Sequence, residues 1–171
     1  MKKNWFLIGL LFLAALSRLV PHPSNFTPVT AMALLATGML ANRWLAFLLP
    51  LFALLVSDLF IGFYEGMIFT YMGLFAVGVV GLYLRENKST FRIAGVTITG
   101  SLVFFILSNL GVWIAAGLYP LTFNGFINCF ANAIPFYGNS LAGDVFYVTV
   151  LFSLYSFYQS YALGAVNENH L

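Results

Sequence analysis

The chain has 171 residues, which is the length of one domain. Apolar residues make up 61 % of it and charged residues only 7 %, whereas an ordinary soluble domain has roughly 45–50 % and 25 %. So few charges cannot cover the surface of a soluble globule, and so many apolar residues exclude a disordered chain. A net charge of +2 gives no basic surface for nucleic acid. With Cys129 as its single cysteine, the chain cannot form an intramolecular disulfide.

Long uninterrupted apolar runs predict an all-α integral membrane protein. We expect one domain, 1–171, with six transmembrane helices at about residues 5–20, 29–41, 44–61, 67–84, 93–118 and 140–162. Residues 1–17 resemble a signal peptide, but we interpret them as a retained first span. Spans two and three are short for two crossings. The alternative, one crossing with a re-entrant piece, would bury Arg43 near the bilayer centre.

The basic residues predict the orientation of the bundle. With a cytoplasmic N-terminus, all of them except Arg18 fall on the inner side: Lys2, Lys3, Arg43, Arg85, Lys88 and Arg92. This bias is what the positive-inside rule expects. Six spans also place the C-terminus in the cytoplasm.

Polar residues then gather near the outer boundary. Arg18, Asp58 and Asp144 lie within about one helical turn of it, at roughly 1.5 Å per residue. Arg18 at a helix end and Asp144 at a helix start also have a purely structural interpretation, because each complements the helix dipole there. Asp58 sits at a helix C-terminus, where an anion is disfavoured. It therefore requires a partner, either Arg18 or a ligand group.

The last outer loop, residues 119–139, is too apolar for a plain loop. Asn124, Asn128 and Asn132 recur every fourth residue and share one face of a helix. We predict a short interfacial or re-entrant helix at about residues 122–133, ended by Pro135, with the asparagine stripe facing water or a solute. Such a helix could act as a lid over an outer cavity. Cys129 is expected to be an inert buried thiol, and no histidine–cysteine cluster indicates a metal site or cofactor.

Four segments carry a resemblance to a known family. They are RLVPHPSNFTP (residues 18–28), SDLFIGF (57–63), SNLGVW (108–113) and AIPFYGN (133–139) with GD (143–144). The chain resembles an uncharacterised family of bacterial integral membrane proteins, itself distantly similar to the S components of energy-coupling-factor (ECF) vitamin transporters. The resemblance implies a bundle in the bacterial cytoplasmic (inner) membrane that captures a small solute from outside. A transmembrane coupling protein and ATPases on other chains would then drive its release.

One feature of S components is missing. They commonly carry Ala-x-x-x-Ala on the first span for docking to the coupling protein, and the nearest substitute here is the stripe Ala33, Thr37 and Ala41 on the second span. This departure leaves a solitary transporter as an alternative to a coupled one.

These patterns predict a membrane transport protein, not an enzyme, that binds a small solute. The surplus of acids at the outer face favours a neutral or cationic solute, and Trp113 favours a flat, vitamin- or nucleobase-like one. The alternatives are a structural or assembly subunit, whose polar residues only bridge helices, and an intramembrane enzyme. The expected substrate-binding residues, with no catalytic or metal-ligating ones, are Arg18, Asn25, Asp58, Asn109, Trp113, Asn128, Asn132, Asn139 and Asp144.

Overall fold

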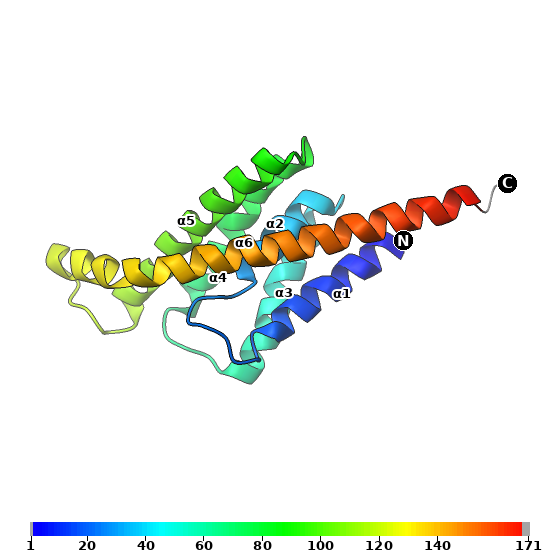
Figure 1. The fold of residues 1–171 in the computed structure, drawn as a ribbon. Coiled ribbons are helices and arrows are strands. Elements are labelled where there is room, and N and C mark those ends of the chain that lie inside the picture. The colour runs from blue at the N-terminus through cyan, green and yellow to red at the C-terminus, as the bar shows by residue number, and fades with distance from the viewer. Residues whose placement is uncertain (1, 169–171) are drawn as a thin grey trace.

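The computed structural model describes residues 2–168, and the side-chain surroundings of residues 5–162. Every secondary-structure element of the described residues is a helix, and loops connect them (Figure 1). The elements in chain order are α1 (Lys2–Ser17), α2 (Val29–Met39), α3 (Arg43–Ile61), α4 (Met67–Gly81), the 3-10 helix η1 (Leu82–Arg85), α5 (Thr90–Ala115) and α6 (Phe123–Glu168).

Four stretches are long and apolar enough to cross a bilayer: Arg43–Ile61, Met67–Arg85, Thr90–Ala115 and Phe123–Ala162. Large apolar side chains on them face outward, including Leu59, Phe91 and Phe157, as a lipid-facing surface requires. The fold is therefore compatible with a helical membrane protein. The apolar helices α1 and α2 are shorter. The 11 residues of α2 rise only about 16 Å, roughly half the thickness of the hydrocarbon core, so the count of six crossings stays a prediction.

The short helix α2 is the centre of the bundle. It contacts every other helix and is buried from Val29 to Gly38. Glycine permits this close packing: a Cβ atom on Gly81 of α4 would lie 3.2 Å from the Cα atom of Leu34 and would also collide with Thr37. The small residues Ala33 and Thr37 are thus covered by the chain's own helices. Ala41, the third residue of the stripe, is exposed but lies beyond the end of α2, so the stripe presents no continuous helical face to another protein.

Arg85 of η1 holds the C-terminal end of α2. Its Nε donates to the Thr37 carbonyl at 2.8 Å, and its Nη2 donates to the Leu40 carbonyl at 2.7 Å. The last carbonyls of a helix lack partners within the helix and carry negative partial charge, so a cation is well placed there. The contact stabilises the end of α2, which lies at Met39, two residues before the predicted limit.

The prediction for the last outer loop was wrong. The short helix at residues 122–133 and the span at 140–162 are parts of one helix, α6, which includes Pro135 and extends past the rest of the bundle at both ends (Figure 1). Proline removes one helical hydrogen bond, to the carbonyl four residues earlier. Here that carbonyl belongs to Ala131, and both residues are exposed. The proline thus lies on an exposed face of α6, and the helix continues through it.

Candidate functional site

One end of the bundle contains a polar cavity of ≈ 330 Å³. Its walls come from the end of α1 and the loop after it, the starts of α2 and α4, the second half of α5 and the middle of α6. The lining residues are Arg18, Asn25, Thr27, Val29, Thr30, Tyr64, Thr70, Phe104, Phe105, Ser108, Asn109, Val112, Ser140 and Asp144. Most of these side chains are polar, in a protein that is otherwise mainly apolar.

The topology explains why these residues meet. Successive helices run in opposite directions, so the loops at residues 18–28 and 62–66 lie at the same end of the bundle (Figure 1). The loops at residues 40–42 and 86–89 lie at the opposite end, with Arg43 and Arg85 beside them. The cavity and these basic residues therefore occupy opposite ends.

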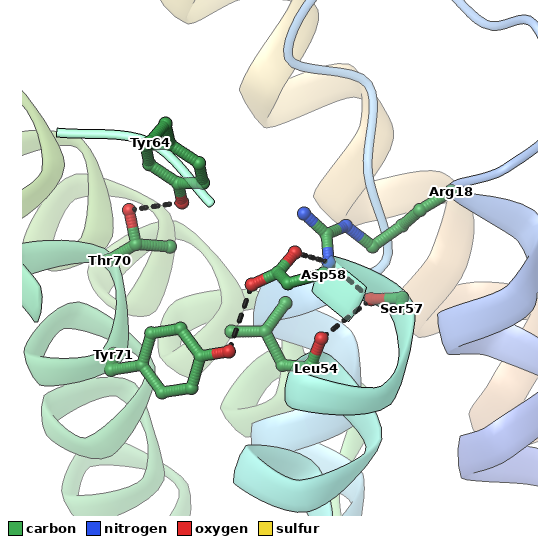
Figure 2. A network of polar contacts seen from close by, with 7 residues as sticks. All are labelled: Arg18, Leu54, Ser57, Asp58, Tyr64, Thr70 and Tyr71. Carbon is green, nitrogen blue, oxygen red and sulfur yellow. Dashed lines mark hydrogen bonds and ion pairs between the residues drawn. The ribbon is translucent and has the colours of Figure 1, made fainter. Parts of the chain in front are cut away.

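A buried ion pair supports one wall of the cavity (Figure 2). Arg18 Nη1 lies 2.6 Å from Asp58 Oδ1 and also donates to the Ser57 hydroxyl. Tyr71 of α4 donates its hydroxyl to Asp58 Oδ2 at 2.9 Å. The Asp58 side chain is 0 % exposed and that of Arg18 is 11 % exposed. Arg18 is thus the partner that the position of Asp58 requires.

Arg18 keeps hydrogen-bonding capacity beyond this pair. A guanidinium group carries five N–H donors, and among the described residues only Nη1 has partners. In Figure 2 a second terminal guanidinium nitrogen has no dashed line to any of the residues drawn. Arg18 lines the cavity and Asp58 does not, so the arginine is the member of the pair that borders the cavity.

Asp144 is the second charged residue of the cavity wall. It is 5 % exposed and makes no ion pair with any described residue. Because α6 begins at Phe123, Asp144 lies about six turns inside the helix, not in its first turn. The dipole at a helix N-terminus acts only within that turn, so the structural interpretation of Asp144 as a dipole partner was wrong.

Asn109 and Asn25 also line the cavity. The Asn109 amide nitrogen donates to the Phe105 carbonyl of its own helix at 2.8 Å, which orients the side chain. On the opposite side, Tyr64 donates its hydroxyl to Thr70 at 2.9 Å (Figure 2). This second hydrogen bond links the loop before α4 to the first turn of that helix.

Four of the expected site residues lie elsewhere. Trp113 Nε1 donates to the Pro120 carbonyl at 3.0 Å, and its ring packs edge-on against Phe126. Asn128, Asn132 and Asn139 are exposed on α6 and do not line the cavity. Asn132 donates to the Tyr119 hydroxyl at 3.2 Å.

Several residues of the cavity wall are not among the expected site residues. Hydroxyl groups come from Thr27, Thr30, Thr70, Ser108 and Ser140, and aromatic rings come from Phe104 and Phe105. Serine and threonine are common in membrane helices, so they give no signal alone. Ser108 and Ser140 do adjoin the candidates Asn109 and Asn139, and Thr27 and Ser108 lie within the segments that carry the family resemblance.

Metal-binding groups do not gather in the described part of the chain. No three histidine, cysteine, aspartate or glutamate side chains come together there. Cys129 is buried, and its thiol donates to the Asn109 backbone carbonyl at 3.6 Å. It therefore packs α6 against α5 behind the cavity.

Residues 1–166 match the sequence profile of a family described as "Family of unknown function (DUF6580)". The match covers nearly the whole chain, which therefore belongs to this family. No curated protein and no solved structure matches the chain.

Proposed function

Because membership in DUF6580 assigns no activity, we propose a function from the cavity itself: the protein binds a small polar solute as part of membrane transport. The observation that carries this proposal is a ≈ 330 Å³ cavity lined by Arg18, Asn25, Asn109 and Asp144. Sites for small molecules have volumes of about 300–1,000 Å³, so the cavity suits a solute at the small end of that range.

The distribution of charge supports an orientation for this function. Arg43, Arg85, Lys88 and Arg92 lie at the end opposite the cavity, and basic residues favour the cytoplasmic side of a bacterial inner membrane. The cavity would then face outward and capture its solute there. Single cysteines at Glu65 and Lys88, labelled in intact cells with a membrane-impermeant maleimide, test the orientation. Labelling at Glu65 alone agrees with it, and labelling at Lys88 alone contradicts it.

The likeness to S components extends the proposal to a partner, a separate transmembrane coupling protein with ATPases. The buried stripe on α2 cannot provide the docking surface, because Ala33 and Thr37 are inside the bundle. A coupling protein would have to contact one of the outer helices. A solitary transporter is the alternative within the same function.

The second candidate function is a structural or assembly subunit. The direct contact between Arg18 and Asp58, at 2.6 Å, favours it, since an ion pair of this kind bridges α1 and α3 without a ligand. It leaves the polar lining around Asn109 and Asp144 unexplained, however. We therefore place solute binding first.

Mass spectrometry of co-purified small molecules tests the function. The full chain is purified in a mild detergent, as the wild type and as Asn109→Ala, with exposed Asn132→Ala as the matched control. We expect a small molecule to accompany the wild type and Asn132→Ala, and to be reduced at least tenfold in Asn109→Ala. Equal occupancy in all three proteins, or no molecule in repeated preparations of any, contradicts solute binding.

A further inference from the structure

The two charged residues of the cavity wall are not equivalent. Arg18 is neutralised by Asp58 at 2.6 Å, so that pair adds no net charge to the cavity. Asp144 has no counter-charge among the described residues. If its carboxyl group is ionised, the cavity therefore carries one negative charge.

The neighbours of Asp144 only partly stabilise that charge. The hydroxyl groups of Thr30 and Ser101 are close enough to favour the charged form of its carboxyl group, but Ser101 Oγ is buried without a hydrogen-bond partner among the described residues. The other ionisable groups of the wall are Arg18, already paired, and the Tyr64 hydroxyl, which donates to Thr70. Hydroxyl dipoles lower the cost of burying a carboxylate, but they do not replace a cation.

We propose that the solute carries a positively charged group, such as a protonated amine, that pairs with Asp144 in the cavity. This inference rests on the proposed function and specifies its substrate class. The free donors of Arg18 supply a second contact, to an acceptor oxygen on the same solute. A small organic cation that also carries an acceptor oxygen can contact both Asp144 and Arg18. The cavity of ≈ 330 Å³ is far larger than a bare inorganic ion needs.

Ligand-induced thermal stabilisation tests the charge. The detergent-solubilised full chain is titrated with two matched series, each made of a cation, a neutral alcohol and an anion. The first series is benzylamine, benzyl alcohol and benzoate, and the second is choline, 3,3-dimethylbutanol and 3,3-dimethylbutanoate. NaCl against KCl at constant ionic strength tests an inorganic cation. The proteins are the wild type, Asp144→Asn, and Thr149→Ala, which changes an exposed residue of the same helix.

We expect the cationic members alone to raise the unfolding midpoint of the wild type and of Thr149→Ala. Their apparent affinity should fall about 30-fold or more in Asp144→Asn, as for loss of one partner of a buried charge pair. If neutral or anionic members bind to the wild type and bind equally well to Asp144→Asn, the charge inference is overturned but solute binding is not. Stabilisation by sodium alone, lost in Asp144→Asn, also overturns it. Absence of binding in every arm also overturns the charge inference, and the co-purification experiment described above then decides separately whether the cavity binds any solute.

The unliganded variants provide a second readout. Asp144→Asn removes an uncompensated buried charge at nearly constant volume, so its unfolding midpoint without ligand should equal or exceed that of the wild type. A clear fall would mean that the protein itself already compensates Asp144, and it would overturn the inference whatever the ligands do.

Discussion

Replacing Asp58 by asparagine tests the buried ion pair most directly. Removing one partner of a buried pair costs about 3–5 kcal/mol, because the other charge is left behind. Arg18 is 11 % exposed and lines a polar cavity, so water can hydrate it in part, and we expect the lower end, about 3 kcal/mol. Weakening the hydrogen bond from Tyr71 adds about 1 kcal/mol at most. For a chain of this length, these losses lower the unfolding midpoint by roughly 6–16 °C.

Tryptophan fluorescence on heating, in one detergent, measures this midpoint. The matched control is Glu86→Gln, which breaks the exposed pair between Arg92 and Glu86 at 3.5 Å, where Glu86 is 81 % exposed. Exposed pairs contribute about 0–1 kcal/mol, so this variant should unfold close to the wild type. If Asp58→Asn loses no more stability than Glu86→Gln, the pair does not hold α1 to α3 and the reasoning fails.

Three further variants test other contacts. Gly81→Ala should unfold at a lower temperature than the wild type or fail to accumulate, because its Cβ atom would collide with α2. The control Gly95→Ala, with nothing within 4 Å of the added atom, should leave the unfolding temperature unchanged or raise it. Equal unfolding temperatures of the two variants would refute the packing argument. Arg85→Gln should lower the unfolding midpoint, because two carbonyls at the end of α2 lose their hydrogen-bond donors. An unchanged unfolding midpoint would show that water replaces the guanidinium group there. Asn132→Ala, outside the cavity, should leave solute binding unchanged, and a loss of bound solute would mean that the exposed face of α6 takes part.

Charge and depth were the most informative sequence signals. An aspartate at a helix C-terminus must be compensated, and Arg18 is the one basic residue expected at that end of the bundle, so the pair of Arg18 with Asp58 could be predicted. Asn25, Asn109 and Asp144 were also found by depth, and all three line the cavity. These signals work because an isolated polar group in an apolar environment requires a partner.

The errors have a different origin. Pro135 predicts the end of a helix, but proline is tolerated inside membrane-spanning helices, and α6 continues through it. That error placed Asp144 at a helix N-terminus, when it lies deep within α6. The regular spacing of Asn128 and Asn132 does place them together, but on an exposed face. Periodicity shows which residues share a face, and packing against the other helices decides where that face points.

The continuity of α6 has a mechanical consequence. A helix of 46 residues is about 69 Å long, and it is the one element that runs from beyond the cavity past the opposite end of the bundle. Beside Asp144 it touches the loop after α1, where a Cβ atom on Gly143 would lie 3.0 Å from the Phe26 Cα atom. Beyond this contact the helix stays packed against the bundle, because Leu151 and Tyr155 are buried and Tyr158 stacks on Phe6 with ring centroids 3.9 Å apart. A shift of α6 beside Asp144 would therefore have to move these contacts as well, so the helix couples the cavity wall mechanically to the opposite end of the bundle.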